Sequence, residues 1–316
     1  MHSANSKHIV PSLPTALSRK AASSEAREAP GFEIDRALFP YASRFLTLKD
    51  GTRIHYVDEG EGPVLLLLHG NPTWSFLYRK IIANMRKDHR CVALDYPGYG
   101  LSSAPIGEPF SPAHLSEVVG EFVEALDLQE VTVMVQDWGG PIGLAFAIAN
   151  AERVRGFVIG NTFAWPLEGK GQKWFSAIMG GPVGRSITWA FQGVARFFLR
   201  KGVSRPIDPG VRAMYLAPFR SRSRRKVTHH APKQLTAAKP FLTQLAQGLP
   251  ELSHKPALLV WGEDDFAFRQ PERLRFERLF TNHETVLLQR AGHFIQEDSP
   301  DEISAAIRAW SGRRAL

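Results

Sequence analysis

Residues 131–143 read Val131-Thr-Val-Met-Val-Gln-Asp137-Trp138-Gly139-Gly140-Pro-Ile-Gly, and this stretch decides the fold. Its first five residues are β-branched or apolar, which predicts a strand buried on both faces. Residues 142–149, which follow, have the composition of a buried helix. The glycines at 139 and 140 would let that helix pass close to the strand. We therefore expect a strand, a tight turn and a helix, with Asp137 at the tip of the turn.

Such a turn is the geometry of a nucleophile elbow, which serine hydrolases write as Gly-x-Ser-x-Gly. Here Asp137 stands in the place of the serine, and Val135 occupies the position two residues before it. A carboxylic acid side chain is already ionised at neutral pH, so it attacks without a base, and its natural targets are carbon atoms that carry a leaving group. The alternative is structural, because Asp is also favoured as a helix N-cap.

Strand and helix patterns alternate on both sides of this turn. Apolar or alternating runs predict strands, and longer runs with helical periodicity predict helices. Strands are expected at residues 51–58, 64–68, 91–94, 154–160, 256–261 and 285–288, and helices at residues 74–85, 271–280 and 300–310. This alternation predicts an α/β fold with a mostly parallel, doubly wound sheet, whose active site lies at the carboxyl ends of the strands.

The alternation stops between residues 163 and 239, which are rich in Trp, Phe, Gly and Arg. Helical segments are expected there near residues 174–178, 187–199 and 209–216. We interpret this block as a helical cap domain inserted over the strand ends. The rest divides into a flexible leader, residues 1–31, and an α/β-hydrolase-like core, residues 32–162 and 240–316. The leader contains no continuous apolar core of the kind a secretory signal needs, and its likeness to an organelle transit peptide is faint, so we expect a cytoplasmic protein.

The excess of positive charge in this chain lies in the cap. The chain has a formal net charge of +8, and residues 163–240 contain 15 Lys and Arg against Glu168 and Asp208. A basic surface can bind nucleic acid or a membrane, and the segment 220–226, Arg-Ser-Arg-Ser-Arg-Arg-Lys, looks like such a patch. It has no interleaved aromatic platform and no nucleic-acid-binding module. We interpret it as a solvated face of the cap, and we expect neither a nucleic-acid partner nor a membrane span.

Two further segments after predicted strands contain candidate catalytic residues. Trp261-Gly-Glu-Asp264-Asp265 follows the strand at 256–261, where an acid can project toward the active edge. His293 lies in the loop after the last strand. A lone histidine in a loop is usually structural, but the order of nucleophile, acid and histidine, each placed after a parallel strand, favours a catalytic triad.

The chain resembles the haloalkane dehalogenases of the α/β-hydrolase superfamily in four segments: His69-Gly-Asn-Pro-Thr-Trp-Ser, Gln136-Asp-Trp-Gly-Gly, Trp261-Gly-x-x-Asp and Gly292-His-Phe-Ile-Gln-Glu-Asp. The likeness covers about residues 32–313. The elbow and histidine segments are fairly specific together, whereas His-Gly-x-Pro alone is shared by many relatives.

The resemblance implies a two-step hydrolysis that needs no cofactor and no metal ion. Asp137 attacks the carbon that carries the halogen, and the indole N–H of Trp138 and the side-chain amide of Asn71 hold the leaving halide. Water then opens the ester on Asp137, with His293 as general base. The backbone N–H groups of Asn71 and Trp138 would bind the resulting oxyanion. The partners expected are a small apolar halogenated substrate, the halide product and water.

The acid that supports His293 is chosen by position. Some dehalogenases carry a Glu after the strand that precedes the cap, but this chain has Asn161-Thr162 there. The spacing Gly-x-x-Asp from Gly262 selects Asp265, with Asp264 as its surface neighbour. An Asp acid combined with an Asn halide donor resembles one branch of the family. The cap tryptophans are rival halide donors that we interpret as cap packing: Trp165, Trp174 and Trp189.

Other functions remain open at this level. An epoxide hydrolase shares the Asp nucleophile but typically uses two cap tyrosines, whereas only Tyr215 lies in this cap and Asn71 replaces the aromatic residue usual in that loop. A luciferase-like monooxygenase and a non-catalytic ligand-binding relative are further alternatives. The apolar cap predicts an apolar pocket. The physiological substrate, its chain length, the oligomeric state and the role of the leader stay undetermined by the sequence.

Overall fold

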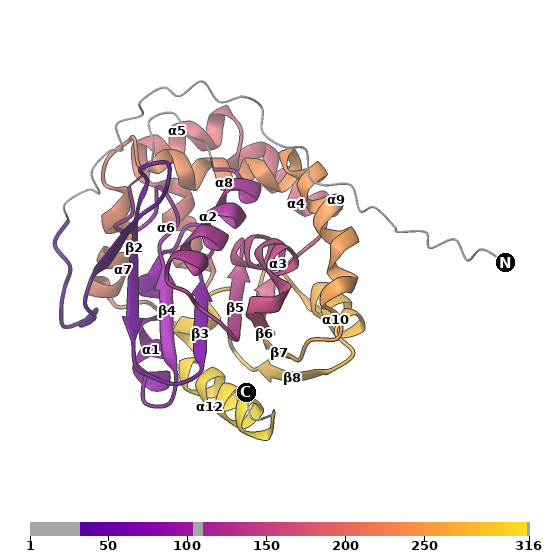
Figure 1. Ribbon diagram of the computed structural model, residues 1–316. Helices are drawn as coiled ribbons and strands as arrows, with labels where there is room; N and C mark the ends of the chain where they lie inside the picture. The colour runs from indigo at the N-terminus through magenta and orange to yellow at the C-terminus, as the bar shows by residue number, and fades with distance from the viewer. Residues whose placement is uncertain (1–31, 104–109, 315–316) are drawn as a thin grey trace.

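The computed structural model describes residues 32–103 and 110–314, so the predicted leader lies outside the described residues. Within these ranges eight strands form one sheet in the order β1-β2-β4-β3-β5-β6-β7-β8 (Figure 1). Strand β2 is antiparallel to both of its neighbours, and the pairs from β4 to β8 are parallel. The strands are β1 Arg44–Thr47, β2 Arg53–Glu59, β3 Val64–Leu68, β4 Arg90–Leu94, β5 Val131–Asp137, β6 Val154–Thr162, β7 Ala257–Gly262 and β8 His283–Leu288. The predicted α/β-hydrolase fold is confirmed.

Helices cover both faces of the sheet. The helices are α1 Arg79–Met85, α2 Pro112–Ala125, α3 Gly139–Ala149, α10 Gln270–Leu279, α11 Ile295–Asp298 and α12 Pro300–Arg314. Side chains of α2, α3 and α10 share one buried cluster, and those of α1 and α12 share the other. The central strands supply both clusters alternately, since Val133 and Val135 of β5 face the first and Met134 faces the second. This explains why residues 131–135 of the strand are apolar or β-branched and do not alternate with charged residues.

Between β6 and β7 the chain forms helices α4 Lys170–Met179, α5 Pro182–Phe191, α6 Gly193–Lys201, α7 Pro209–Leu216, α8 Arg225–Ala237 and α9 Lys239–Gly248, of which α4 to α8 lie within the proposed cap. Helices α4, α5 and α8 lie over the end of the sheet at which β3 and β5 finish (Figure 1). The division into core and cap at residues 163 and 239 remains our proposal. Within the described residues no helix is both long and apolar enough to cross a bilayer.

Several predicted elements differ in detail. The expected helix at 74–85 begins as a 3-10 turn, Ser75–Tyr78, before α1. The expected helix at 187–199 is two helices, because Gln192 adopts a left-handed conformation with φ of 56° and breaks the helical hydrogen bonding. Strand β1 and helices α2, α8 and α9 were not predicted. The last two are polar in sequence and are helical because one face of each packs against neighbours.

The interpretation of residues 220–226 as a solvated face is wrong in part. Arg220 and Arg222 are exposed. Arg224, by contrast, donates from Nη1 to the main-chain oxygen of Ser102 at 2.7 Å and from Nη2 to that of Gly100 at 3.0 Å. Burial lowers its pKa to about 10. The sequence could not distinguish this residue from its neighbours, because its acceptors lie more than 120 residues away.

Candidate active site

The predicted elbow is present at the junction of β5 and α3. Asp137 ends β5 with a φ of 51°, a left-handed conformation that few side chains adopt without cost. A Cβ atom at Gly139 would collide with the main-chain oxygen of Leu68, and one at Gly140 would collide with the hydroxyl of Thr162. The two glycines are therefore required by close approach of the helix to β3 and β6.

The carboxylate of Asp137 is held by groups far away in the sequence. The backbone N–H of Asn71 donates to Oδ1 at 2.7 Å, and Nε2 of His293 lies 3.5 Å from Oδ2. The hydroxyl of Thr162 donates to the main-chain oxygen of Asp137 at 2.5 Å. Helix α3 has no side-chain cap. The alternative that Asp137 is merely a helix N-cap is therefore wrong.

His293 lies between two carboxylates. Its Nδ1 is 3.0 Å from Oδ2 of Asp265, and its Nε2 faces Asp137. Burial alone would lower the pKa of His293, but the charges and hydrogen bonds of Asp265 and Asp137 outweigh burial and raise it to about 10. Asp265 is buried and Asp264 is exposed, so only Asp265 can serve this ring. The structure thus brings together all three predicted triad residues.

Asn161, near the end of β6, also contacts Asp265. Its Nδ2 donates to Oδ2 of Asp265 at 2.9 Å and to the main-chain oxygen of Gly262 at 3.1 Å, while its Oδ1 accepts from the N–H of Gly262 at 2.7 Å. The amide therefore fixes the carboxylate that contacts His293. Sequence reasoning noted only that Asn161 is not an acid, and it missed this role.

Gln136 is a second residue whose role was missed. Its amide nitrogen donates to the main-chain oxygen of His293 at 3.0 Å and lies 3.2 Å from Nε2 of the same residue. This amide can donate to Nε2 only when the ring is neutral and Nε2 carries a lone pair, so it opposes protonation of the ring. A polar residue directly before Asp137, in a strand that is otherwise predicted to be buried, is the signal that could have identified Gln136.

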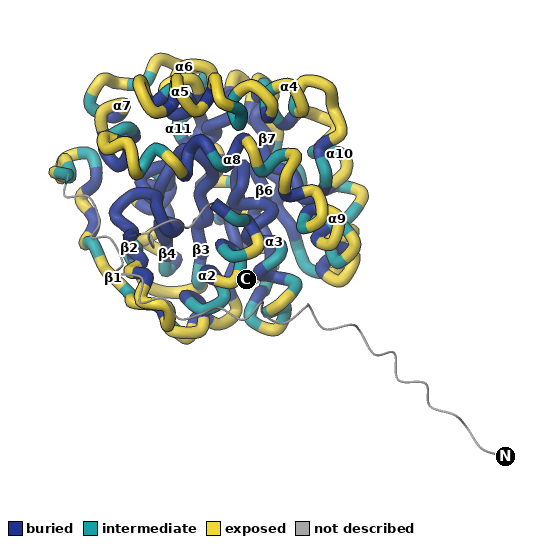
Figure 2. Tube along the Cα trace, turned by 90° about the horizontal axis from the view of Figure 1, so that it is seen from above, coloured by how far each residue is buried: buried dark blue, intermediate teal, exposed yellow. Residues whose placement is uncertain are grey.

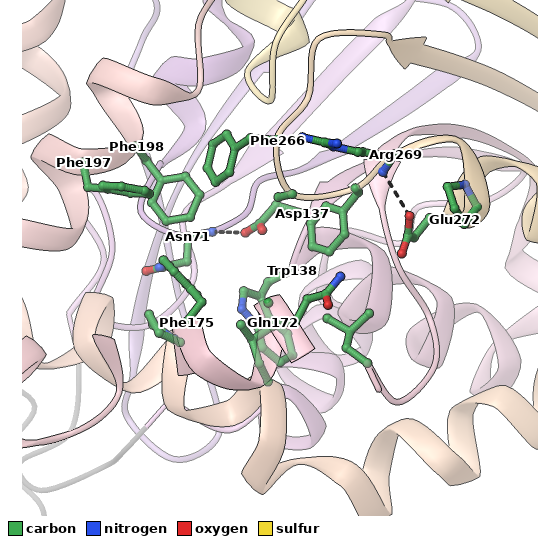
Figure 3. A pocket seen from close by; sticks show the side chains of 17 residues that line it. Asn71, Asp137, Trp138, Gln172, Phe175, Phe197, Phe198, Phe266, Arg269 and Glu272 are labelled. Atoms are coloured by element: carbon green, nitrogen blue, oxygen red, sulfur yellow. Dashed lines mark hydrogen bonds between the residues drawn. The ribbon is translucent and has the colours of Figure 1, made fainter. Parts of the chain in front are cut away.

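A cavity of about 480 Å³ opens in front of Asp137. Its wall is mostly apolar, and Asn71 and Trp138 lie beside the carboxylate (Figure 3). The lining residues are Asn71, Asp137, Trp138, Leu167, Gly171, Gln172, Phe175, Phe197, Phe198, Pro232, Leu235, Phe266, Ala267, Phe268, Arg269, Pro271 and Glu272. Arg269 and Glu272 lie away from the carboxylate, and the N–H of Arg269 donates to Glu272 at 3.0 Å.

The two predicted halide donors differ in how they are held. Among the described residues the indole N–H of Trp138 has no acceptor, so it is free for a ligand. The side-chain oxygen of Asn71 accepts from the hydroxyl of Tyr99 at 2.9 Å, and its Nδ2 lies 3.5 Å from the main-chain oxygen of Thr228. If the side-chain amide of Asn71 were flipped, its oxygen would face the main-chain oxygen of Thr228, which is unfavourable. Tyr99, which the sequence did not identify, therefore sets the orientation of Asn71.

The rival donors lie elsewhere. Trp165 is buried against Phe276 and Arg275 of α10, so it has a packing role as predicted, but its partners lie in the core and not in the cap. Trp174 is 68% exposed and Trp189 is 36% exposed, so the prediction that they pack inside the cap is wrong. Neither lines the cavity. Within the described residues no cluster of three or more His, Cys, Asp or Glu side chains could hold a metal ion.

Comparisons with known proteins agree with this geometry. The α/β hydrolase fold family matches residues 63–179. Haloalkane dehalogenase 2 of Mycobacterium tuberculosis is 44% identical over 278 residues, which are 87% of this chain and 97% of that protein. A cis-3-alkyl-4-alkyloxetan-2-one decarboxylase of Shewanella oneidensis is 30% identical over 86% of this chain and 88% of its own. The crystal structure of haloalkane dehalogenase DatA from Agrobacterium tumefaciens C58 matches with a TM-score of 0.78 at 26% identity, covering 86% of this chain and 96% of that one.

Proposed function

This chain belongs to the haloalkane dehalogenase family of α/β hydrolases, and we propose that it hydrolyses haloalkanes to an alcohol, a halide ion and a proton through an alkyl ester on Asp137. One observation carries the proposal. A carboxylate that needs no activation faces an apolar cavity, two N–H donors line the same cavity, and a histidine lies behind the carboxylate.

In the first step a carboxylate oxygen of Asp137 displaces the halide. Oδ1 is already held by the N–H of Asn71, so Oδ2 is the oxygen that remains to form the bond to carbon. The electron pair of the carbon–halogen bond leaves with the halogen. The Trp138 indole and the Asn71 amide are the donors that face the developing halide charge, and their fixed positions lower the barrier without reorganisation.

In the second step water attacks the carbonyl carbon of the ester. His293 removes a proton from this water, and Asp265 stabilises the imidazolium that forms. The negative charge then lies on Oδ1, where the Asn71 N–H is in place. We propose the backbone N–H of Trp138 as the second donor to this oxyanion. Within the described residues this N–H forms no hydrogen bond to the carboxylate. Collapse of the intermediate breaks the bond between the carbonyl carbon and the alkoxy oxygen, the imidazolium of His293 returns a proton to that oxygen to give the alcohol, and loss of one proton to solvent restores the Asp137 carboxylate.

An epoxide hydrolase is the nearest competing function, and the cavity argues against it. Ring opening creates an alkoxide that needs a proton donor, yet no tyrosine is among the described residues that line the cavity. The hydroxyl of Tyr215 donates instead to Glu297, which is also paired with Arg79. This buried cluster joins α7 to α1 and α11, so Tyr215 has a structural partner and no access to substrate.

The proposed partners are therefore a small apolar halogenated compound, its halide and water. We retain a cytoplasmic location as a proposal. Cys91 is the single cysteine of the sequence, which leaves no pair for an internal disulfide and is in keeping with a reducing compartment.

The test uses 1-bromobutane, 1,2-dibromoethane and styrene oxide. We expect halide and proton release from both bromoalkanes and no diol from the epoxide.

Asp137→Ala should abolish turnover, because the ester forms on this side chain. Asn71→Ala should slow cleavage of the carbon–halogen bond by on the order of tenfold. Loss of one preorganised donor slows reactions that concentrate charge on oxygen by more, because a large halide spreads its charge. Tyr215→Phe should stay within a few-fold of the wild-type rate provided that the variant is folded.

A trapping experiment tests the two-step mechanism. His293→Phe should release about one equivalent of bromide per enzyme and then stop, since the histidine acts only after the halide has left. Intact mass should show a butyl group, and peptide mapping should place it on Asp137. A folded variant that forms no adduct would contradict the ester mechanism. Halide release from simple bromoalkanes also separates a dehalogenase from a luciferase-like monooxygenase and from a non-catalytic ligand-binding relative.

A further inference from the structure

Large apolar side chains gather on the outer side of the cap. Within the described residues nine large hydrophobic side chains are exposed, and seven of them belong to helices α4, α5 and α6. These are Trp174 (68% exposed), Ile178 (49%), Val183 (62%), Ile187 (41%), Trp189 (36%), Phe191 (70%) and Phe197 (37%), which we call the cap face. The other two, Phe45 and Leu287, lie on β1 and β8. A single exposed hydrophobic residue is ordinary, but a group of this kind marks an interaction site.

Two of the three helices, α4 and α5, have few buried positions. Helix α4 buries only Ser176 and α5 buries only Gly184 and Thr188, so Trp174 and Phe191 face outward, whereas α6 buries one side of its own. Figure 2 shows α4, α5 and α6 along the edge of the molecule, largely in the colour of exposed residues. Burial within the chain therefore does not explain the apolar side chains that α4 and α5 contribute to the cap face, whereas Phe197 of α6 also packs against Phe198 and Phe266.

The charge of helices α4 to α6 indicates what kind of partner could bind the cap face. Between Glu168 and Asp208 the sequence has no acidic residue and seven basic ones. All seven are exposed: Lys170, Lys173, Arg185, Arg196, Arg200, Lys201 and Arg205. A partner that suits this surface must accept aromatic and aliphatic side chains and must itself be negatively charged. Helices with Trp, Phe and Ile among Lys and Arg are typical of segments that lie in the interface of anionic membranes.

We propose that the cap face binds the surface of a membrane that contains anionic lipids. The apolar side chains of α4 and α5 enter the boundary between headgroups and acyl chains, and the seven basic residues contact lipid phosphates. A second copy of the chain, bound face to face, would oppose basic side chains with no acid between them, so a lipid surface fits better. This contact does not depend on the proposed catalytic function.

The position of the active site agrees with such a surface. Phe197 belongs to the cap face and also lines the cavity, and Gly171, Gln172 and Phe175 of α4 line the same wall. The wall of the cavity and the exposed cap face thus share helices α4 and α6. Apolar compounds concentrate in the hydrocarbon of membranes, and the cavity would lie next to that phase.

The experiment is sedimentation of the full-length protein with vesicles in the absence of substrate. Phosphatidylcholine vesicles are compared with vesicles that contain three parts in ten of phosphatidylglycerol, at low and at high sodium chloride. The test variant is Trp174→Ser with Phe191→Ser, and the matched control is Phe45→Ser with Leu287→Ser. None of these four residues lines the cavity, so turnover of dissolved 1-bromobutane serves only to show that each variant is folded.

We expect the wild type and the control to bind the anionic vesicles, with affinity that falls as salt rises. The test variant should bind at least roughly tenfold more weakly, which corresponds to about 1.4 kcal/mol. Equal binding of the test variant, or absence of binding by the wild type, would overturn the proposal. Light scattering that showed an oligomer of the wild type, broken by the test variant and without vesicle binding, would reassign the cap face to self-association.

Discussion

At the scale of single residues, Asn71 serves the site in two ways. Its backbone N–H binds Oδ1 of Asp137, and its side-chain amide lines the cavity in which a halide would leave. The amide is useful only if its nitrogen, and not its oxygen, faces that space. The hydroxyl of Tyr99 holds the oxygen at 2.9 Å and so decides which end is presented.

Replacement of Tyr99 by Phe should therefore weaken halide binding as well as carbon–halogen cleavage. Loss of one hydrogen bond of about 0.5–1.5 kcal/mol corresponds to a decrease of roughly 2- to 10-fold. Bromide affinity, measured by quenching of tryptophan fluorescence, and the first-turnover rate of bromide release should decrease together. Tyr96→Phe is the control, because the buried Tyr96 hydroxyl has no hydrogen-bond partner among the described residues. Unchanged bromide affinity in Tyr99→Phe would refute this role.

The charge on His293 differs between the two steps. In the free enzyme two carboxylates outweigh the effect of burial and raise its pKa to about 10, so the ring is protonated at neutral pH. Formation of the ester removes the charge of Asp137, and the pKa must then fall toward the value that burial and Asp265 set. The amide of Gln136 at Nε2 also favours the neutral ring. The histidine thus becomes a base when one is needed.

This change predicts different pH dependences for the two steps. The first-turnover release of bromide should vary little between neutral pH and pH 9, whereas ester hydrolysis should accelerate with rising pH until the ring is neutral in the ester. Rapid-quench measurements at several pH values separate these rates. Parallel pH profiles for both steps would contradict the assignment.

The same raised pKa affects stability. Because the pKa in the folded state lies above the ordinary value, the stabilising contribution of His293 is complete below about pH 6.5 and is lost as pH rises through about 10. The difference in thermal stability between the wild type and His293→Phe should shrink over this range.

At the scale of elements, the junction of β5 and α3 depends on glycines that allow close contact. Helix α3 begins directly against β3, and Gly139 is the residue that meets the main chain of Leu68. A backbone oxygen cannot move aside as a side chain can. The geometry of the elbow, and with it the position of Asp137, is therefore intolerant of a methyl group at this position.

Gly139→Ala should destabilise the fold by about 1–3 kcal/mol or more through overpacking, and it should reduce turnover by displacing Asp137. Gly312→Ala is the matched control, since its Cβ would meet no atom within 4 Å and it lies in helix α12. That change should be neutral or stabilise by about 0.5–1 kcal/mol. Denaturant unfolding of both variants provides the comparison. Equal stability of the two variants would contradict the packing argument.

At the scale of the whole molecule, the cap is fastened to the core at sites that surround the catalytic residues. Arg224 binds the loop that carries Tyr99, through Gly100 and Ser102. Asp298 accepts from the N–H groups of Gly292 and Ser204, which ties the loop of His293 to the chain after α6. These contacts couple the position of the cap to Asn71, the proposed halide donor, and to His293, the proposed base.

Arg224→Ala should consequently affect both stability and activity. It leaves two carbonyl groups without this donor, and a hydrogen bond from a charged group contributes about 1.5–3 kcal/mol. We expect a lower melting temperature and slower bromide release, with ester hydrolysis less affected. Arg222→Ala removes an exposed charge two residues away and should change stability by less than about 0.5 kcal/mol. Loss of stability in Arg222→Ala to the same extent would point to surface charge instead of the bonds of Arg224.

The sequence by itself determined the features that depend on neighbouring residues. The buried strands, the tight turn at Asp137 and the placement of Asp265 and His293 after strands follow from local patterns of apolar residues and glycines. These patterns persist whatever the rest of the chain does, because strand and helix periodicity are properties of the local backbone. The order of the parallel strands then brings the ends of β5 and β7 and the loop after β8 to one edge of the sheet.

Only the tertiary structure decided which side chains meet. Asn161 and Asp265 are 104 residues apart, Tyr99 and Asn71 are 28 apart, and Arg224 and Ser102 are 122 apart. A polar residue gains its role from the direction and distance of its partner, and both depend on strand register and cap packing. The exposure of Trp174 and Trp189 also depends on tertiary packing. Their apolar character predicted burial, but no neighbouring element fully covers these side chains in the described part of the chain.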